Sequence, residues 1–177
     1  MMHRRCALVV VLAGACSADP PPPPVDLCDS TVASKVVTAG SAQLGLGDDC
    51  APVAEGQQVG LVCGTQGGTM FLVNARVQDL DITAQHQGAV DFTAIGPGGA
   101  NLTAVSIGCR VRDFTMASDG TMQLRTAYGL QLDPEALQTL QLEGASIQIT
   151  AKVRDHLGQQ ATDTRTIVAH LPPACAP

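Results

Sequence analysis

The chain has 177 residues, of which 45% are hydrophobic and only 2% aromatic, and its net charge is −6. This length suits one domain with appendages, and the hydrophobic content suffices for a core of aliphatic side chains. The acidic balance argues against binding to nucleic acid or to anionic lipid head groups. With no Trp and one Tyr, the chain also lacks the exposed rings on which β-sandwich proteins commonly stack sugars.

Residues 1–15 have the form of an export signal. Residues 1–5 are basic, residues 7–13 form an apolar run, and Ala13 and Ala15 give a small-residue cleavage pattern. The apolar run is too short for a helix that crosses a bilayer of about 30 Å, and no later stretch is long and apolar enough. We therefore expect a mature chain without a transmembrane helix.

Cys16 follows the cleavage site directly. The four residues that end in Cys16 resemble the lipobox of bacterial lipoproteins, in which this cysteine is acylated, although Ala13 stands where Leu is commonest. The alternative is a plain signal-peptidase site and a freely secreted product. We favour the lipid anchor, because a cysteine here otherwise has no explanation. Residues 16–41 then hold the anchor cysteine and a linker, whose prolines at 20–24 make a spacer of roughly 15 Å.

Alternating apolar residues beyond the linker predict a sandwich domain over residues 42–173, followed by a tail at 174–177. The glycine-rich stretch 64–68 is expected to join two strands into the antiparallel hairpin around which the others are arranged. The expected strands, in chain order, cover residues 42–47, 57–63, 70–77, 90–94, 102–114, 121–132, 147–153 and 160–171.

The strand at 102–114 has the clearest alternation. It places Cys109 and Val111 on the face expected to meet the core, and Arg110 and Arg112 on the face expected to meet solvent. Ser-Asp-Gly at 118–120 then predicts a tight turn into the next strand.

One short helix is expected among the strands. Asp133 suits a helix cap, Pro134 suits the first helical position, and Gly144 ends the pattern, so one or two turns would cross between sheets. The whole pattern predicts an all-β fold: an immunoglobulin-like antiparallel β-sandwich with one short connecting helix. A β-barrel is the alternative.

The seven cysteines predict disulfides rather than a metal cluster, because no Cys-x-x-Cys pair occurs and histidines are scarce. Cys6 leaves with the signal. If Cys16 is acylated, five cysteines remain, and one thiol is free or pairs outside the chain. If Cys16 is not acylated, six remain and three bridges are possible.

Two bridges are predicted from the expected strands. Cys63 and Cys109 both fall on core faces, where a bridge would pin two sheets together and stabilise the fold by roughly 4 kcal/mol. The alternative is a pair of buried free thiols that act as small hydrophobic residues. Cys50 and Cys175 would pair if the first and last strands of a seven-strand sandwich run the same way.

The sequence gives little support for a catalytic site. His86, His156 and His170 fall in a loop, a turn and a strand end, and no Gly-x-Ser-x-Gly elbow exists. We therefore expect no catalytic residues, no cofactor and no enzyme.

Two acidic pairs could act as ligands for Ca²⁺ or as glycosidase carboxylates. They are Asp48 with Asp49 and Asp79 with Asp81. Short acidic pairs at strand ends are usually solvated turns, and the spaced ligands of a full calcium loop are missing. We therefore expect no metal site. The stretch 64–68 likewise lacks the Lys-Ser/Thr of a phosphate-binding loop.

A resemblance covers about residues 42–171. The residues that carry it are Leu44, Gly45, Gly47, Gly56, the Gly-x-Gln-Gly-Gly stretch at 64–68 and Arg76. This pattern is similar to a group of exported bacterial lipoproteins with an immunoglobulin-like sandwich, in which the stretch is Gly-Pro-Gln-Gly-Gly-x-His. Thr65 and Met70 stand here in place of the Pro and the His. The resemblance implies the fold and the export route and brings no assigned activity.

The sequence therefore predicts a cell-envelope lipoprotein whose sandwich serves as a non-catalytic binding or structural module. Its expected partners are an unidentified envelope protein or surface ligand, and the membrane through a lipid on Cys16. Nucleic acid is not expected. The expected location is the outer membrane or periplasm, or outside the cell if the lipid is absent. The alternative functions are a freely secreted disulfide-bonded hydrolase and a calcium-dependent adhesion module.

Overall fold

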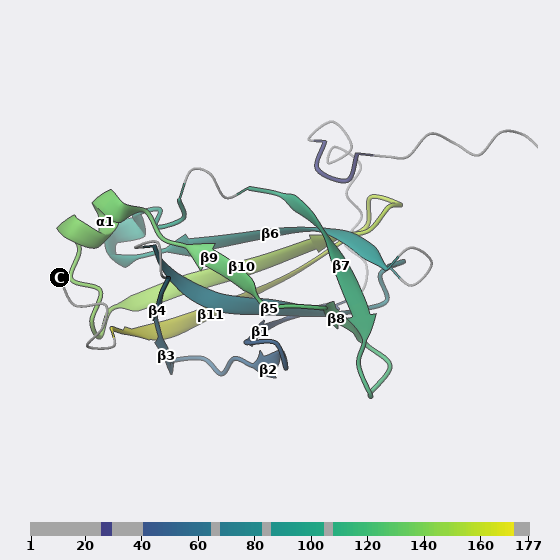
Figure 1. The fold of residues 1–177 in the computed structure, drawn as a ribbon, viewed down its shortest axis with the longest axis horizontal. Coiled ribbons are helices and arrows are strands. Elements are labelled where there is room, and N and C mark those ends of the chain that lie inside the picture. The colour runs from purple at the N-terminus through teal and green to yellow at the C-terminus, as the bar shows by residue number, and fades with distance from the viewer. Residues whose placement is uncertain (1–25, 30–40, 65–67, 83–85, 105–107, 172–177) are drawn as a thin grey trace, which may run out of the picture.

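The computed structural model describes residues 26–29, 41–64, 68–82, 86–104 and 108–171. The strands are β1 (Ser41–Leu46), β2 (Ala51–Pro52), β3 (Gln57–Gly60), β4 (Val62–Cys63), β5 (Thr69–Gln78), β6 (Gln87–Ile95), β7 (Arg110–Met116), β8 (Met122–Leu124), β9 (Tyr128–Gln131), β10 (Ser146–Arg154) and β11 (Gln160–His170). The longest strands follow the long axis of the molecule, with the α-helix α1 (Pro134–Thr139) at one end and the β7–β8 hairpin at the other (Figure 1).

The strands form two layers that β7 joins. Sheet A has the order β7-β6-β10-β11-β3, and sheet B has the order β2-β1-β5-β8-β7, with β4 and β9 also paired to β5. The first half of β7 pairs with β6 and its second half pairs with β8, so this strand passes from one layer to the other. The expected all-β sandwich with one short helix is confirmed. Its strand pairs are antiparallel except for β3 with β11, which are parallel.

Apolar side chains from both layers meet in one core. The alternation in β10 shows how: its buried residues are Ile147, Ile149, Ala151 and Val153, while the residues between them are not buried. The three Phe side chains of the molecule are among the most deeply buried. The core is therefore largely aliphatic, as the composition predicted.

The expected strand at 57–63 is divided between the two layers. β3 pairs with β11 in sheet A, whereas Val62 and Cys63 in β4 pair with Met70 and Thr69 in sheet B. Leu61 lies at the crossing, where its side chain is 2% exposed and its N–H donates to the His170 carbonyl oxygen at 2.8 Å. The expected hairpin exists, but it consists only of β4 and β5.

Arg110 and Arg112 are exposed as expected, but the expected core position of Val111 is wrong. Val111 is 40% exposed, whereas the Arg112 guanidinium lies 5.3 Å from the centre of the Tyr128 ring. Phe114, which lies in phase with Arg112, is fully buried and decides which face of β7 meets the core. Residues 105–107 of the expected strand lie outside the described residues.

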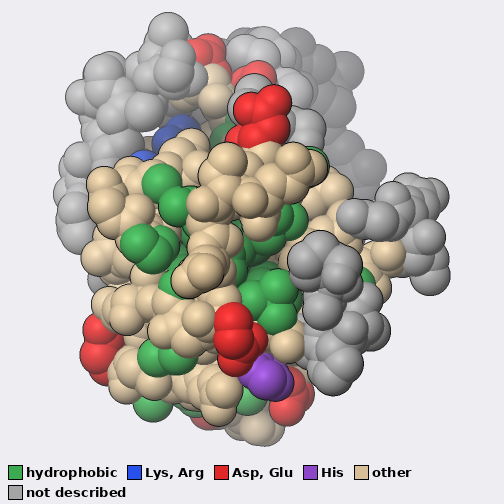
Figure 2. Space-filling model, turned by 90° about the vertical axis from the view of Figure 1, so that its left-hand side faces the viewer, with side chains coloured by type: hydrophobic (Ala, Val, Ile, Leu, Met, Phe, Trp, Pro, Cys, Tyr) green, Lys and Arg blue, Asp and Glu red, His purple; other side chains and the backbone are tan. Residues whose placement is uncertain are grey.

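Two further boundaries differ from expectation. The expected strand at 121–132 is two strands, β8 and β9, which pair with separate parts of β5. The helix α1 starts as predicted, since the Asp133 carboxylate accepts the Glu135 N–H at 3.0 Å. It ends at Thr139, and Gly144 lies in the next turn with φ of 72°. The α1 end of the molecule shows apolar side chains at its centre and acidic side chains scattered around them (Figure 2).

Candidate functional site

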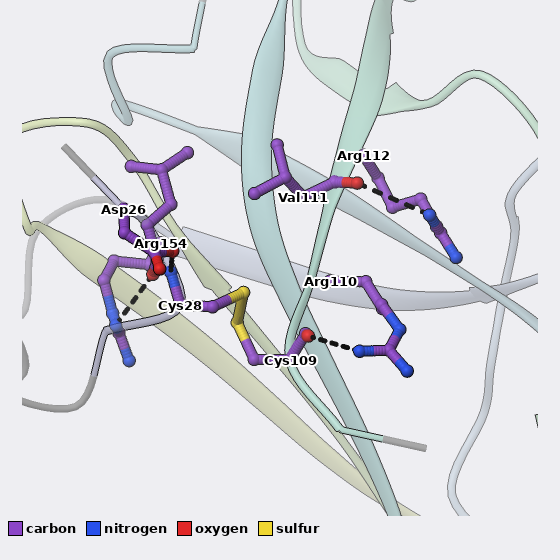
Figure 3. The surroundings of a disulfide bond; sticks show 8 residues. Asp26, Cys28, Cys109, Arg110, Val111, Arg112 and Arg154 are labelled. Atoms are coloured by element: carbon purple, nitrogen blue, oxygen red, sulfur yellow. Dashed lines mark hydrogen bonds between the residues drawn. A yellow bond between two sulfur atoms is a disulfide. The ribbon is translucent and has the colours of Figure 1, made fainter. Parts of the chain in front are cut away.

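A short N-terminal segment is attached to the outer face of sheet A. Cys28 forms a disulfide with Cys109, 81 positions later, with 5.6 Å between their Cα atoms (Figure 3). Leu27 beside it is 6% exposed, and its carbonyl oxygen accepts a hydrogen bond from Arg154 Nη1 at 3.0 Å. We call residues 26–29 with this disulfide the staple. It holds the segment by one covalent bond, one hydrogen bond and a buried apolar side chain.

The predicted bridge between Cys63 and Cys109 is therefore wrong. Cys109 lies just before β7 and faces the outside of sheet A, near Ala89 and Lys152, rather than the core. Alternation along a strand does not tell which of its two faces is buried, and no local signal identifies Cys28 as the partner of Cys109. Cys63 is nevertheless in a disulfide, and none of the other described cysteines is its partner.

Cys50 carries a buried free thiol, so the predicted bridge between Cys50 and Cys175 is also wrong. Cys50 has φ of 51° in the turn after β1, and its side chain lies against Gly45, where an added Cβ would be 2.5 Å from Sγ. Burial raises the pKa of the Cys50 thiol, and the nearby Arg76 guanidinium opposes this only in part. A thiol in this state is poorly reactive. Cys16 and Cys175 lie outside the described residues.

A groove of about 310 Å³ opens where β1 of sheet B lies against β11 of sheet A. Its lining is largely polar and comes from β1, β5, β11 and the turn between β7 and β8. The lining residues are Ser41, Ala42, Gln43, Arg76, Val77, Gln78, Asp119, Thr121 and Arg165. We call this the arginine groove. In the sequence, Arg76 stands out only through the resemblance and Asp119 only as part of the turn at 118–120.

Arg76 is held on one side of the groove. Its Nη1 donates to the Asp119 carboxylate at 3.2 Å and its Nη2 to Gln123 at 3.0 Å. Its Nε is buried without a hydrogen-bond partner. Hydrogen bonds from Thr121 hold the pKa of Asp119 below its usual range, and the Arg76 charge lowers it further. The guanidinium is thus fixed in direction before any ligand arrives.

Arg165 lines the groove from β11. Its Nε donates to the Asp163 carboxylate at 3.0 Å, and Asp163 also accepts the Leu44 N–H of β1 at 2.8 Å. Asp163 and Arg165 share the phase of the buried residues Ile167 and Ala169. Charged residues on an inward phase are a known device for protecting a sheet edge, and this was the signal in the sequence that could have identified them.

The arginine groove brings Arg76 and Arg165 to one largely polar surface. Two guanidinium groups are balanced by Asp119 and Asp163, so neither charge is left uncompensated. Within the described residues, the terminal nitrogens of Arg165 make no hydrogen bond that competes with a ligand. Guanidinium groups bind carboxylates and phosphates in preference to neutral groups.

None of the described histidines lines this groove. His156 Nε2 is 3.5 Å from the Asp81 carboxylate, and His170 Nδ1 is 3.0 Å from Glu143. The Leu171 N–H and His170 lower the pKa of Glu143. No hydrogen bond joins a histidine to a Ser, Thr or Cys side chain in the parts of the chain that the structure describes. Both contacts are His–carboxylate pairs; His156 lies in the turn between β10 and β11, and His170 is the last residue of β11.

The acidic residues mostly serve turns. Asp48 accepts the Ala127 N–H at 2.7 Å. Asp155 is fully buried and accepts three backbone N–H groups, from Asp81 at 2.9 Å, Leu157 at 2.9 Å and Gln159 at 2.8 Å. Across the described ranges, no three His, Cys, Asp or Glu side chains gather as metal ligands would.

The chain was compared with known proteins. No protein-family model matches it, and no curated protein sequence matches it. In the described parts of the chain, no helix has the length and apolar character needed to span a membrane. The fold, the staple and the arginine groove are therefore the observations on which a function must rest.

Proposed function

We propose that this protein is a cell-envelope lipoprotein that is anchored through Cys16 and whose sandwich is a non-catalytic binding or structural module. The observation that supports this most is the staple. A disulfide between Cys28 and Cys109 is typical of a protein exported to an oxidising compartment. The same bond also joins the sequence next to the proposed anchor directly to the folded domain.

The position of the staple suits an attachment point. Cys28 follows Cys16 by twelve positions, and a fully extended chain of that length spans at most about 40 Å. Any pull on Cys16 would reach sheet A through the bond between Cys28 and Cys109. The first strand, β1, would not carry that load.

The arginine groove is the binding surface that we propose. Most of its lining comes from sheet B, whereas the staple lies on sheet A, so attachment does not cover it. The fixed guanidinium of Arg76 and the terminal nitrogens of Arg165 favour a ligand that carries a carboxylate or phosphate group. This fits a surface ligand or an envelope protein with an acidic segment.

Metabolic labelling with a radioactive fatty acid tests the anchor. We expect label on the native chain, none on the Cys16→Ala variant, and full label on the Cys50→Ala variant, which removes a different cysteine. The native chain should sediment with membranes and the Cys16→Ala chain should not. An unlabelled native chain in the soluble fraction would contradict the anchor and favour the freely secreted alternative.

A further inference from the structure

The first half of β7 forms an exposed edge of sheet A. Residues 110–113 pair with β6 on one side, whereas β7 pairs with β8 only from Phe114 onward. All four of these residues are exposed. On the side away from β6, this stretch has no neighbouring strand within the described residues. We call residues 110–113 the β7 edge.

The backbone groups of Val111 point to the open side of the β7 edge. Phe114 donates its N–H to the His86 carbonyl oxygen at 2.7 Å on the β6 side, and the Asp113 carbonyl oxygen accepts the Arg125 N–H at 3.0 Å on the opposite side. The direction of backbone hydrogen bonds alternates from residue to residue along a strand, so Val111 shares the direction of Asp113. In the part of the chain that the structure describes, the outward N–H of Val111 finds no acceptor.

Arginine side chains cover the outward carbonyl oxygens only weakly. Arg110 Nη1 donates to the Cys109 carbonyl oxygen and Arg112 Nη1 to that of Val111, each at 3.5 Å (Figure 3). Hydrogen bonds of this length are weak, so a backbone N–H of an added strand can replace the guanidinium. Both guanidinium groups lie on the side of β7 away from the bond between Cys28 and Cys109 (Figure 3).

Two other edge strands are protected in ways that the β7 edge is not. β2, at the edge of sheet B, has two residues and ends in Pro52, which has no N–H to donate. β3, at the other edge of sheet A, has four residues and ends in Gly60. The β7 edge has neither Pro nor Gly, and its central apolar side chain, Val111, is 40% exposed. Its protection is by charge alone, which repels strands of like charge and admits strands of opposite charge.

The charges at the β7 edge favour an acidic strand. The Arg112 guanidinium lies 5.3 Å from the centre of the Tyr128 ring, and across the described ranges neither Arg112 nor the exposed Arg125 forms an ion pair with a carboxylate. A second copy of β7 is disfavoured here. Antiparallel pairing about Val111 would place Arg110 of each copy opposite Arg112 of the other, and like charges directly opposite one another are destabilising.

We propose that the β7 edge binds an extended acidic segment of a partner protein by antiparallel strand addition. The N–H and C=O of Val111 pair with one residue of the segment, and acidic side chains on either side of that residue face Arg110 and Arg112. An apolar residue opposite Val111 covers its exposed side chain. The recognised pattern is therefore acidic, apolar, acidic. This inference is independent of the lipid anchor and of the arginine groove.

A fluorescent peptide that carries Glu-Val-Glu between serines tests the proposal by anisotropy with the full exported chain. We expect binding of this peptide and none of the Lys-Val-Lys peptide. A methyl group on the backbone nitrogen of the peptide's Val should weaken binding by at least about tenfold, because this N–H faces Val111. A methyl group on the nitrogen of a neighbouring Glu, which points away from β7, should leave binding unchanged. Loss at neither position would show that charge alone holds the peptide and would overturn strand addition.

Variants of the protein test the location. Arg112→Met keeps an apolar stem over Tyr128 and should weaken binding of the Glu peptide by about tenfold. The matched control is Lys152→Met, which removes a positive charge from the outer face of sheet A and should bind as the native chain does. Arg112→Glu should bind the Lys peptide instead. The methylated peptides are read with the native protein, so they decide the question even if a variant fails to fold.

Two results with the variants would overturn the proposal. Equal losses in Arg112→Met and Lys152→Met would show that the peptide responds only to the total charge. A loss in Arg76→Met with none in Arg112→Met would place the peptide in the arginine groove. That second result would support the proposed function while removing the β7 edge as a binding surface.

Discussion

The outer face of sheet A and the arginine groove on the side of sheet B are built from opposite kinds of contact. Sheet A carries a segment held by the disulfide between Cys28 and Cys109 and by the buried Leu27. The groove depends on hydrogen bonds and ion pairs of Arg76 and Arg165, and the nearby Cys50 is unoxidised. One region is held by a covalent bond, and the other by polar contacts between side chains. The proposed function assigns attachment to the first region and binding to the second.

Breaking the staple should have the largest effect. Cys28→Ser opens a loop of 81 positions, so we expect a loss of about 4 kcal/mol of unfolding free energy, measured by denaturant titration. Cys109→Ser should cost the same, and the double variant no more, because one bond is lost in each case. Additive losses would mean that the two cysteines do not act through a shared bond. Cys50 should stay protected in all three variants if the two regions are independent.

The next largest effect is expected where the layers meet. Asp155→Ala leaves three backbone N–H groups without their acceptor, including that of Asp81 from the turn after β5. We expect a loss of about 3 kcal/mol, visible as an earlier midpoint in denaturant. Asp155→Asn keeps one acceptor oxygen and should lose less. An unchanged midpoint in the Ala variant would show that water replaces the carboxylate.

On the groove side, Arg76→Met should have a smaller effect. The variant keeps the apolar stem and loses the contacts to Asp119 and Gln123, which are partly exposed. We expect a loss of about 1 kcal/mol together with weaker binding of anionic ligands. Arg125→Met is the matched control, because Arg125 is exposed and lies outside the groove. Equal effects of the two variants on stability and on anion binding would contradict a specific role for the groove.

The pH dependence of folding stability should reveal the contribution of Asp119 within the groove. Hydrogen bonds from Thr121 lower the pKa of Asp119 from its ordinary 3.8, so the ionised carboxylate favours the folded state. This contribution is complete above the ordinary pKa and is lost as the pH falls through the lowered one. The Asp119→Asn variant should therefore have a slightly lower melting temperature than the native chain at neutral pH. In strong acid the two melting temperatures should be equal. A difference that grows on acidification would contradict this assignment.

The smallest effect is expected for alkylation of the Cys50 thiol in the folded protein. Burial and a raised pKa keep its thiolate scarce, so alkylation should be slow in the folded chain and fast in denaturant. The rate, followed by mass spectrometry, reports on opening of the structure around β1. Fast labelling of the folded chain would show that this part of sheet B opens far more readily than its buried contacts suggest.

The strands β10 and β11 were predictable because their evidence is local. Ile147, Ile149, Ala151 and Val153 alternate with residues that are not buried, and a turn with Gly158 joins the two strands. The cap of α1 at Asp133 is likewise a property of neighbouring residues. In both cases the signal and the structure lie within one element, so period and propensity were sufficient.

The functional candidates were not predictable in the same way. The groove joins Arg76, Asp119 and Arg165, which come from three distant parts of the chain, and the staple joins cysteines 81 positions apart. The phase of β7 depended on whether Val111 or Phe114 reached the core, and both assignments satisfy the same alternation. Only the packing of the two layers distinguishes such choices.

By itself, the sequence determined the fold class, the alternating core and the short capped helix, because each depends on contacts between near neighbours. The tertiary structure alone decided which cysteines pair, where the chain crosses from β3 to β4, and which charged side chains share a groove. The physical reason is that these features depend on distances between residues far apart in sequence. The alternation of apolar and polar residues along a strand constrains those distances only weakly.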